Sequence, residues 1–157
     1  MRTLSKEEAN HFLNKTIKIA RKATCERSSC GAIIVKNNRI IGAGINSPPG
    51  DLESQRRCHI KKKEYDVKVT DKTCCVHAEQ RAMFDALKRH PDKISGSTLY
   101  FARLKEGRIS FAKNPYCTIC SKIALDLGIK EFVLFHEKDA IAYDTEEYND
   151  LSYNFNK

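Results

Sequence analysis

Apolar positions along the chain switch between helical and extended spacing, which predicts an α/β domain. Ser5 and Glu8 form a capping box, and apolar residues then recur every three or four positions, predicting a helix from about Ser5 to Lys22. The run GAIIVKNNRIIGAGI (31–45) predicts two strands joined by a tight Asn-Asn turn. Both strands are continuously apolar, so we expect them inside a sheet that is covered on both faces.

The same alternation continues toward the C-terminus. Helical spacing returns in residues 76–89, and the short apolar runs 97–104 and 131–135 are typical of buried strands. Between these strands a third helix is predicted, with Asn114 as its cap and Pro115 in its first turn. A short final helix follows near the C-terminus. This order predicts a three-layer α/β/α fold with a central mixed sheet of about five strands.

Length and composition indicate one globular domain covering residues 1–157. The chain is 41% hydrophobic and 31% charged, which is ordinary for a globular protein. Its apolar runs are too short to cross a membrane, and its first residues lack a secretory signal, so we expect a cytoplasmic protein without a membrane partner. Residues 52–74 form a basic, turn-like insertion that is too long for a plain connection.

Cysteine content and charge suggest a metal and an anionic partner. Seven cysteines are an odd number, which favours metal binding over a disulfide framework in a reducing compartment. The net charge of +8 indicates nucleotide phosphate or nucleic acid as a partner. Aromatic residues make up only 8% of the chain and tryptophan is absent, which argues against a base-stacking platform but leaves nucleic acid open.

Two polar clusters fall at predicted helix starts. Cys117 and Cys120 are spaced to share one helix face, whereas His77 and Glu79 converge only if His77 lies at the very start of its helix. One imidazole and two thiolates leave a fourth tetrahedral position open, as in catalytic zinc sites. The metal would acidify a water there, and Glu79 could transfer its protons.

Other interpretations of the cysteines remain open. Cys74 or Cys75 could close a purely structural zinc site, and a C-x-x-C pair can also be a thioredoxin-like redox motif. A second, structural zinc could hold the basic insertion in place. Its candidate ligands are Cys25, Cys30, Cys58 and His59.

H-A-E at 77–79 and the later P-x-C-x-x-C resemble the cytidine deaminase superfamily, whose signature is H-x-E…P-C-x-x-C. The hairpin and the GINSPPG loop look most like its deoxycytidylate deaminase branch. The chain departs from this pattern because Tyr116 stands between Pro115 and Cys117, and because the connection preceding this motif is unusually long.

The resemblance implies a zinc-dependent hydrolase that converts the exocyclic amine of a cytosine nucleotide or nucleoside to a carbonyl and releases ammonia. Glu79 would shuttle protons, Asn46 would contact the sugar, and the Ala78 backbone would receive the pyrimidine carbonyl. The zinc ligands would be His77, Cys117 and Cys120. Self-association into a homo-oligomer is also implied. The alternatives are a deaminase of another base (guanine-type, or adenosine or cytosine in RNA or DNA) and a non-catalytic, zinc-stabilised binding module.

Overall fold

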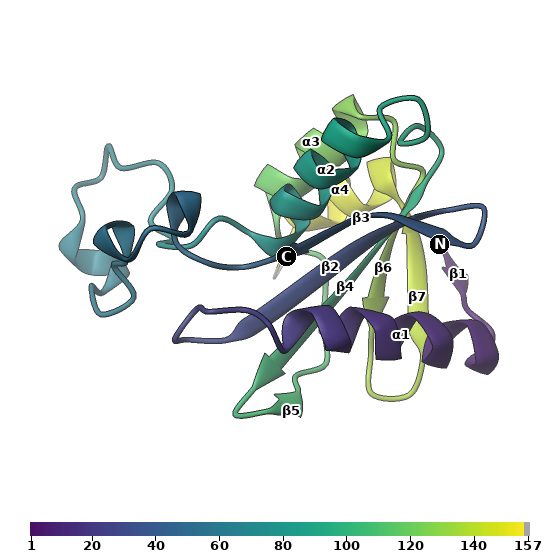
Figure 1. The fold of residues 1–157 in the computed structure, drawn as a ribbon, viewed down its shortest axis with the longest axis horizontal. Helices are drawn as coiled ribbons and strands as arrows, with labels where there is room; N and C mark the ends of the chain where they lie inside the picture. Colours follow the sequence, from purple (N-terminus) through teal and green to yellow (C-terminus); the bar gives the residue numbers. More distant parts are fainter. Residues whose placement is uncertain (156–157) are drawn as a thin grey trace.

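A seven-stranded mixed sheet forms the centre of the protein, and helices cover both of its faces (Figure 1). The computed structural model describes residues 1–155. The strands are β1 (Arg2–Thr3), β2 (Ser29–Lys36), β3 (Arg39–Ile45), β4 (Thr98–Lys105), β5 (Arg108–Ile109), β6 (Glu131–Phe135) and β7 (Ala140–Asp144). The α-helices are α1 (Lys6–Ala20), α2 (Ala78–Arg89), α3 (Thr118–Asp126) and α4 (Thr145–Tyr153).

The strand order is β1-β7-β6-β4-β2-β3, and β5 pairs with β4. β4 and β6 run parallel, while the other pairs are antiparallel. Helix α1 covers one face of the sheet, and α2, α3 and α4 cover the other (Figure 1). The predicted three-layer fold is confirmed, but the sheet is wider than the expected five strands because short strands extend its edges.

Two apolar cores, one on each face of the sheet, explain the continuously apolar strands. On β2, Ile33 packs in the core beneath α1, and its neighbour Ile34 packs in the core beneath α2 and α3. Alternate residues of a strand point to opposite faces, so burial on both faces requires an unbroken apolar run. Asn37 and Asn38 both adopt positive φ, as the tight turn between β2 and β3 requires.

The start of the third helix differs from the prediction. Helix α3 begins at Thr118 with Cys117 as its N-cap, whereas Asn114 and Pro115 lie in the non-helical approach. The Cys117 thiol takes the capping role by accepting a hydrogen bond from the Cys120 amide at 3.5 Å. The segment before α3 is held against the sheet by a hydrogen bond from the Ala112 amide to the Phe135 carbonyl.

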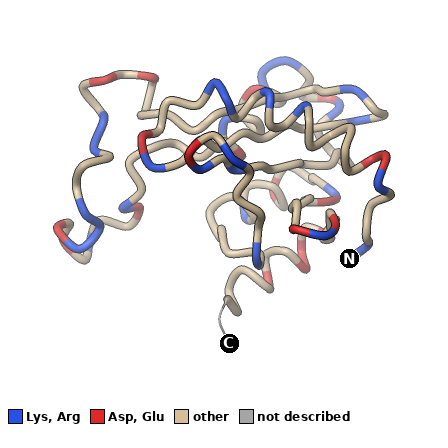
Figure 2. The backbone as a smooth tube through the Cα atoms, turned by 90° about the horizontal axis from the view of Figure 1, so that it is seen from below, with Lys and Arg blue, Asp and Glu red and all other residues tan. Residues whose placement is uncertain are grey.

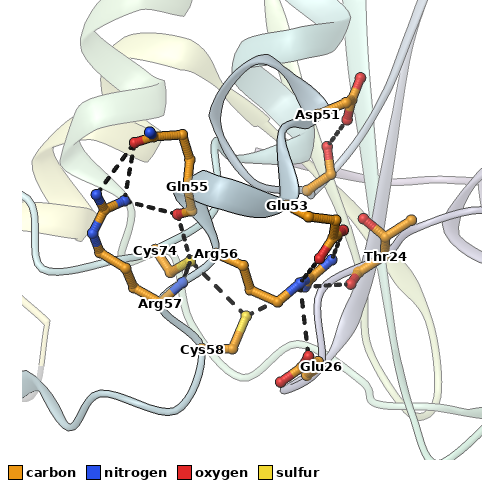
Figure 3. Close-up of polar contacts among 10 residues, drawn as sticks. Thr24, Glu26, Asp51, Glu53, Gln55, Arg56, Arg57, Cys58 and Cys74 are labelled. Atoms are coloured by element: carbon orange, nitrogen blue, oxygen red, sulfur yellow. Dashed lines mark hydrogen bonds and ion pairs between the residues drawn. The ribbon is translucent and has the colours of Figure 1, made fainter.

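Residues 46–76 form a long connection that projects from the body of the protein and contains three short 3-10 turns, Pro49–Asp51, Glu53–Gln55 and Lys62–Glu64 (Figure 1). Basic and acidic residues both occur along it (Figure 2). The Arg56 guanidinium binds Glu53 at 2.7 Å and donates to the Thr24 carbonyl at 2.8 Å, which ties the connection to the segment before β2 (Figure 3). No described helix is long and apolar enough to cross a membrane.

Candidate active site

Three predicted metal ligands meet where α2 and α3 begin. His77 is the N-cap of α2 and has extended backbone angles (φ −68°, ψ 146°). Because His77 lies outside the helix, the helical rotation between positions 77 and 79 does not force its imidazole away from the Glu79 side chain. The His77 Nδ1 atom lies 3.3 Å from the sulfur of Cys117 and 3.3 Å from that of Cys120. Tetrahedral zinc separates such ligand atoms by about 3.5–4 Å, so this donor set fits zinc after small adjustments.

The fourth coordination position is not filled by the protein in the part of the chain that the structure describes. The three ligand atoms lie within 4.8 Å of one another, and no further His, Cys, Asp or Glu joins them between residues 1 and 155. Cys74 and Cys75 were the alternative fourth ligands, and both lie elsewhere. A zinc ion held by these three residues alone would keep one tetrahedral position open.

The environment of Cys117 favours the thiolate that metals bind. A hydrogen bond from Cys120, supported by His77, lowers the pKa of the Cys117 thiol to about 5. Cys120 is buried beside this thiolate, which raises its pKa. A bound cation would favour deprotonation of both thiols, because metal binding to such ligands releases their protons.

Glu79 lies in the first turn of α2 and is only 6% exposed. Burial, together with the nearby Cys117, raises the pKa of its carboxyl to about 7. A carboxyl that titrates near neutrality can both take up and deliver a proton. Glu79 is outside the group of three ligands, so it is free for that role.

A cavity of about 280 Å³ adjoins these residues and is lined by Asn46, His77, Ala78, Glu79 and Cys117, among others. Its size suits a small ligand. Ala78 is fully buried at its wall.

Asn46, expected at the sugar, is nearly buried, and its side chain is engaged with the backbone. Its Oδ1 accepts from the Cys30 amide at 2.8 Å, and its Nδ2 donates to the Ser28 carbonyl at 3.0 Å. Asn46 therefore fixes the start of β2 beside the cavity, and a direct contact with substrate stays a prediction.

A second thiol cluster lies beside the first, but its membership differs from the predicted set. The sulfurs of Cys25, Cys58 and Cys75 lie within 4.8 Å of one another, and that of Cys74 is 3.9 Å from Cys58. Two residues of the predicted set, Cys30 and His59, are not part of this cluster. Cys30 is buried on β2, where its thiol contacts Ser28 at 3.7 Å, and His59 is exposed to solvent.

The sequence prediction missed several residues of the cavity wall, among them Arg27, Lys62, Phe101 and Arg103. Arg103 left one signal in the sequence, because it is a charged residue within the apolar run of β4. Its place in the wall depends on how β4 pairs with β2, where it stands opposite Cys30. The sequence alone does not give that register.

The chain is similar in sequence to known deaminases. The sequence model described as the cytidine and deoxycytidylate deaminase zinc-binding region matches residues 6–136. The deoxycytidylate deaminase of Mycobacterium phage D29 is 29% identical over 129 residues, covering 78% of this chain and 90% of the phage protein. The deoxycytidylate deaminase of Schizosaccharomyces pombe is 26% identical over 136 residues, which are 81% of this chain and 36% of the yeast protein. The chain thus spans well under half of that yeast relative.

Solved structures support the fold. The dCMP deaminase from cyanophage S-TIM5, in complex with dCMP and dUMP, superimposes with a TM-score of 0.58 at 23% identity, over 82% of this chain and 81% of that one. The cytidine deaminase from Burkholderia pseudomallei gives 0.57 at 16% identity, over 92% and 96%. Because the family match runs from the start of α1 to just past β6, the chain belongs to the cytidine and deoxycytidylate deaminases that share this zinc-binding region.

Proposed function

We propose that the protein hydrolyses the exocyclic amine of a cytosine nucleotide, with deoxycytidylate (dCMP) as the first candidate substrate. The observation that carries this proposal is the convergence of His77, Cys117 and Cys120 beside the buried Glu79 carboxyl at one cavity. The family and the names of its curated relatives support the reaction class and the choice of cytosine.

In the proposed mechanism, His77, Cys117 and Cys120 would hold a zinc ion, which would supply a Lewis acid and lower the pKa of a water molecule toward neutrality. Glu79 accepts a proton from this water and delivers protons to the base and to the departing amino group. A carbon–oxygen bond forms at the carbon that carries the amine, the carbon–nitrogen bond breaks, and ammonia leaves. In this proposal, the Ala78 amide, in the first turn of α2, donates a hydrogen bond to the pyrimidine carbonyl.

Charge at the cavity favours a nucleotide over a nucleoside. Arg27, Lys62 and Arg103 line the cavity, and Glu79 is the one acidic residue in its described lining. A 5′-phosphate would be attracted to these cations. The Arg27 guanidinium is already oriented, since it donates to the carbonyls of Cys58 and Ile60 at 3.0 and 2.6 Å.

We also propose a second, structural zinc held by Cys25, Cys58 and Cys75, with Cys74 as the nearest further thiol. This set replaces the one expected from the sequence. Three thiols from three separate segments lie within reach of one ion, which suits a site that fixes a long connection. Metal analysis should give two zinc ions per chain in the wild type, and one each in Cys58→Ser and Cys117→Ser. A single zinc in the wild type would contradict the second site.

The decisive experiment measures ammonia release from free bases, nucleosides, nucleotides and short RNA. We expect cytosine nucleotides to be the best substrates. Glu79→Gln should keep its zinc and fold but lose turnover by about 100-fold or more, because the proton carrier is gone. Glu137→Gln, at an exposed site, is the matched control.

Each alternative predicts its own result in this assay. A purine, or RNA, deaminated in preference to cytosine nucleotides would point to a deaminase of another base. A zinc-loaded wild type that releases no ammonia from any compound, with no change in Glu79→Gln, would support a non-catalytic module.

A further inference from the structure

The cavity beside the candidate metal centre has a neighbour on the far side of one shared wall. This second cavity, of about 240 Å³, is lined by residues of the β5–α3 connection and of the C-terminal part, including Phe111, Asn114, Tyr148 and Phe155. The two cavities share five lining residues, which are Glu79, Phe101, Arg103, Tyr116 and Cys117. Both cavities therefore reach the carboxyl and one of the thiols of the proposed reaction centre.

Tyr116 is half exposed and contacts Arg103 and Phe155 in this shared wall. The Arg103 guanidinium donates a hydrogen bond to the Tyr116 hydroxyl, and its central carbon lies 5.7 Å from the centre of the Tyr116 ring. The Phe155 ring packs against Tyr116 with 6.0 Å between centroids. Arg103 in turn lies over the Phe101 ring at 5.9 Å. A chain of contacts that begins in β4 thus reaches the phenol ring.

The backbone also fixes Tyr116 relative to the reaction centre. Tyr116 directly precedes Cys117, which caps α3 and approaches His77. It is the residue that stands between proline and the first cysteine of the motif, where the signature has none. The Tyr116 backbone is therefore positioned next to a proposed zinc ligand.

We propose that Tyr116, positioned by Arg103, is the specificity-determining wall that limits the substrate to a single-ring base. The inference rests on the proposed function, since it concerns the same cavity. With the ring in place, the space beyond it is closed to the base. Without the ring, the two cavities join, and the added space is nearly as large as the first cavity, so a second ring or a bulky ring substituent could enter.

Equilibrium binding and turnover test this wall together. Zinc-loaded wild type, Tyr116→Ala, Tyr116→Phe and Arg103→Met would be titrated calorimetrically with dUMP, a dUMP carrying a bulky 5-substituent, and dGMP. Turnover of dCMP would be measured in parallel. We expect Tyr116→Ala to improve binding of the larger ligands relative to dUMP by about tenfold or more, the scale on which pockets discriminate by size. Tyr116→Phe should keep the wild-type ratio, and Arg103→Met should fall between them.

The outcomes separate this inference from the proposed function. An unchanged ligand ratio in Tyr116→Ala, with zinc retained and dCMP deaminated by the wild type, would overturn the wall and leave the deaminase standing. An increase in Tyr116→Phe as large as in Tyr116→Ala would also overturn it, because the hydroxyl and not the ring would then matter. A wild type that neither binds dUMP nor deaminates dCMP would overturn both. Tyr153→Ala, which is exposed and lines neither cavity, is the control substitution.

Discussion

The thiol of Cys117 is used twice. Its sulfur accepts the Cys120 amide as the cap of α3, and it also lies 3.3 Å from the His77 imidazole. A helix start stabilises negative charge, so the same position that ends the irregular approach also favours a thiolate. Cys117 occupies the cap position, so the cap predicted at Asn114 was wrong. The spacing of the two cysteines predicted their approach to His77, which the structure shows.

Substitutions of Asn46 can distinguish its structural role in the turn from a contact with the substrate. We expect Asn46→Ala to lower the free energy of unfolding by about 1–3 kcal/mol, because the Cys30 amide and the Ser28 carbonyl lose their partners in a buried setting. Urea denaturation measures this loss. Asn46→Asp keeps the acceptor for Cys30 and should be affected less.

A second measurement on the same variants tests the predicted sugar contact. If Asn46 also contacts the substrate, KM should rise in Asn46→Asp. A loss of stability alone would lower the amount of folded enzyme and leave KM unchanged. An unchanged denaturation midpoint in Asn46→Ala would contradict the structural role.

Among the secondary-structure elements, the edge strand β1 depends on charge as well as pairing. The Arg2 guanidinium donates two hydrogen bonds to Glu131 of β6, at 2.9 and 3.0 Å. It also forms an ion pair with Glu8 of α1 at 3.5 Å. The hydrogen bond from Arg2 lowers the pKa of the Glu131 carboxyl below its ordinary value. A carboxyl with a lowered pKa stabilises the fold above its unfolded-state pKa and loses that contribution as pH falls.

We therefore expect Arg2→Met to reduce the free energy of unfolding by about 0.5–1 kcal/mol at pH 7, the size typical of a well-oriented, partly exposed ion pair. The difference from wild type should shrink as the pH falls below about 4, where Glu131 becomes protonated in the unfolded chain and then in the folded one. Denaturation at several pH values checks this. Arg108→Met, on the exposed strand β5, should show no such trend.

The strands with long apolar runs were predicted well from the sequence. β2, β3, β4 and β6 lie close to their expected bounds because burial on two faces demands uninterrupted apolar residues. β7 was missed because it is a short strand, lying between β1 and β6, whose five residues follow the charged turn at 136–139. Its position depends on pairing with β6, and pairing of this kind has no local signature.

At the scale of the whole molecule, the projecting connection is held to the body at several points. Arg56 and Arg27 bind across to it, and the thiols of Cys25, Cys58 and Cys75 meet where it joins the body. The lysines at 61–63 are exposed. If zinc fills the thiol cluster, its removal should free the connection for local opening, while the sheet and its two cores stay intact.

We expect a strong chelator to accelerate tryptic cleavage at residues 61–63 by several-fold, as followed by mass spectrometry of the fragments. Cys58→Ser should be cut rapidly without chelator, and chelation should then add little. Cys117→Ser, which lacks a ligand of the other site, should respond to chelation as the wild type does. Equal cleavage of wild type with and without chelator would argue against a zinc that fixes this connection.

Homo-oligomer formation and a cytoplasmic location stay predictions.

The convergence of His77, Cys117 and Cys120 could be predicted from the sequence, and the shape of the pocket could not. His77, Glu79 and the cysteine pair were identifiable because local spacing at helix starts decides where such side chains point. The wall formed by Arg103 and Tyr116 joins a strand to a loop across the sheet. Likewise, Cys75 joins Cys25 and Cys58 only because distant segments meet in space. Such contacts follow from the tertiary arrangement rather than from local pattern.

The parallel pairing of β4 with β6 has a consequence for how a newly made chain acquires its metal. Cys117 and Cys120 lie in the crossover that joins these two strands, and a crossover cannot close as a tight hairpin. With β4 and β6 paired, the crossover brings both thiols beside His77. Completing the sheet and binding the ion would then stabilise each other, because an unfolded chain offers no preformed site.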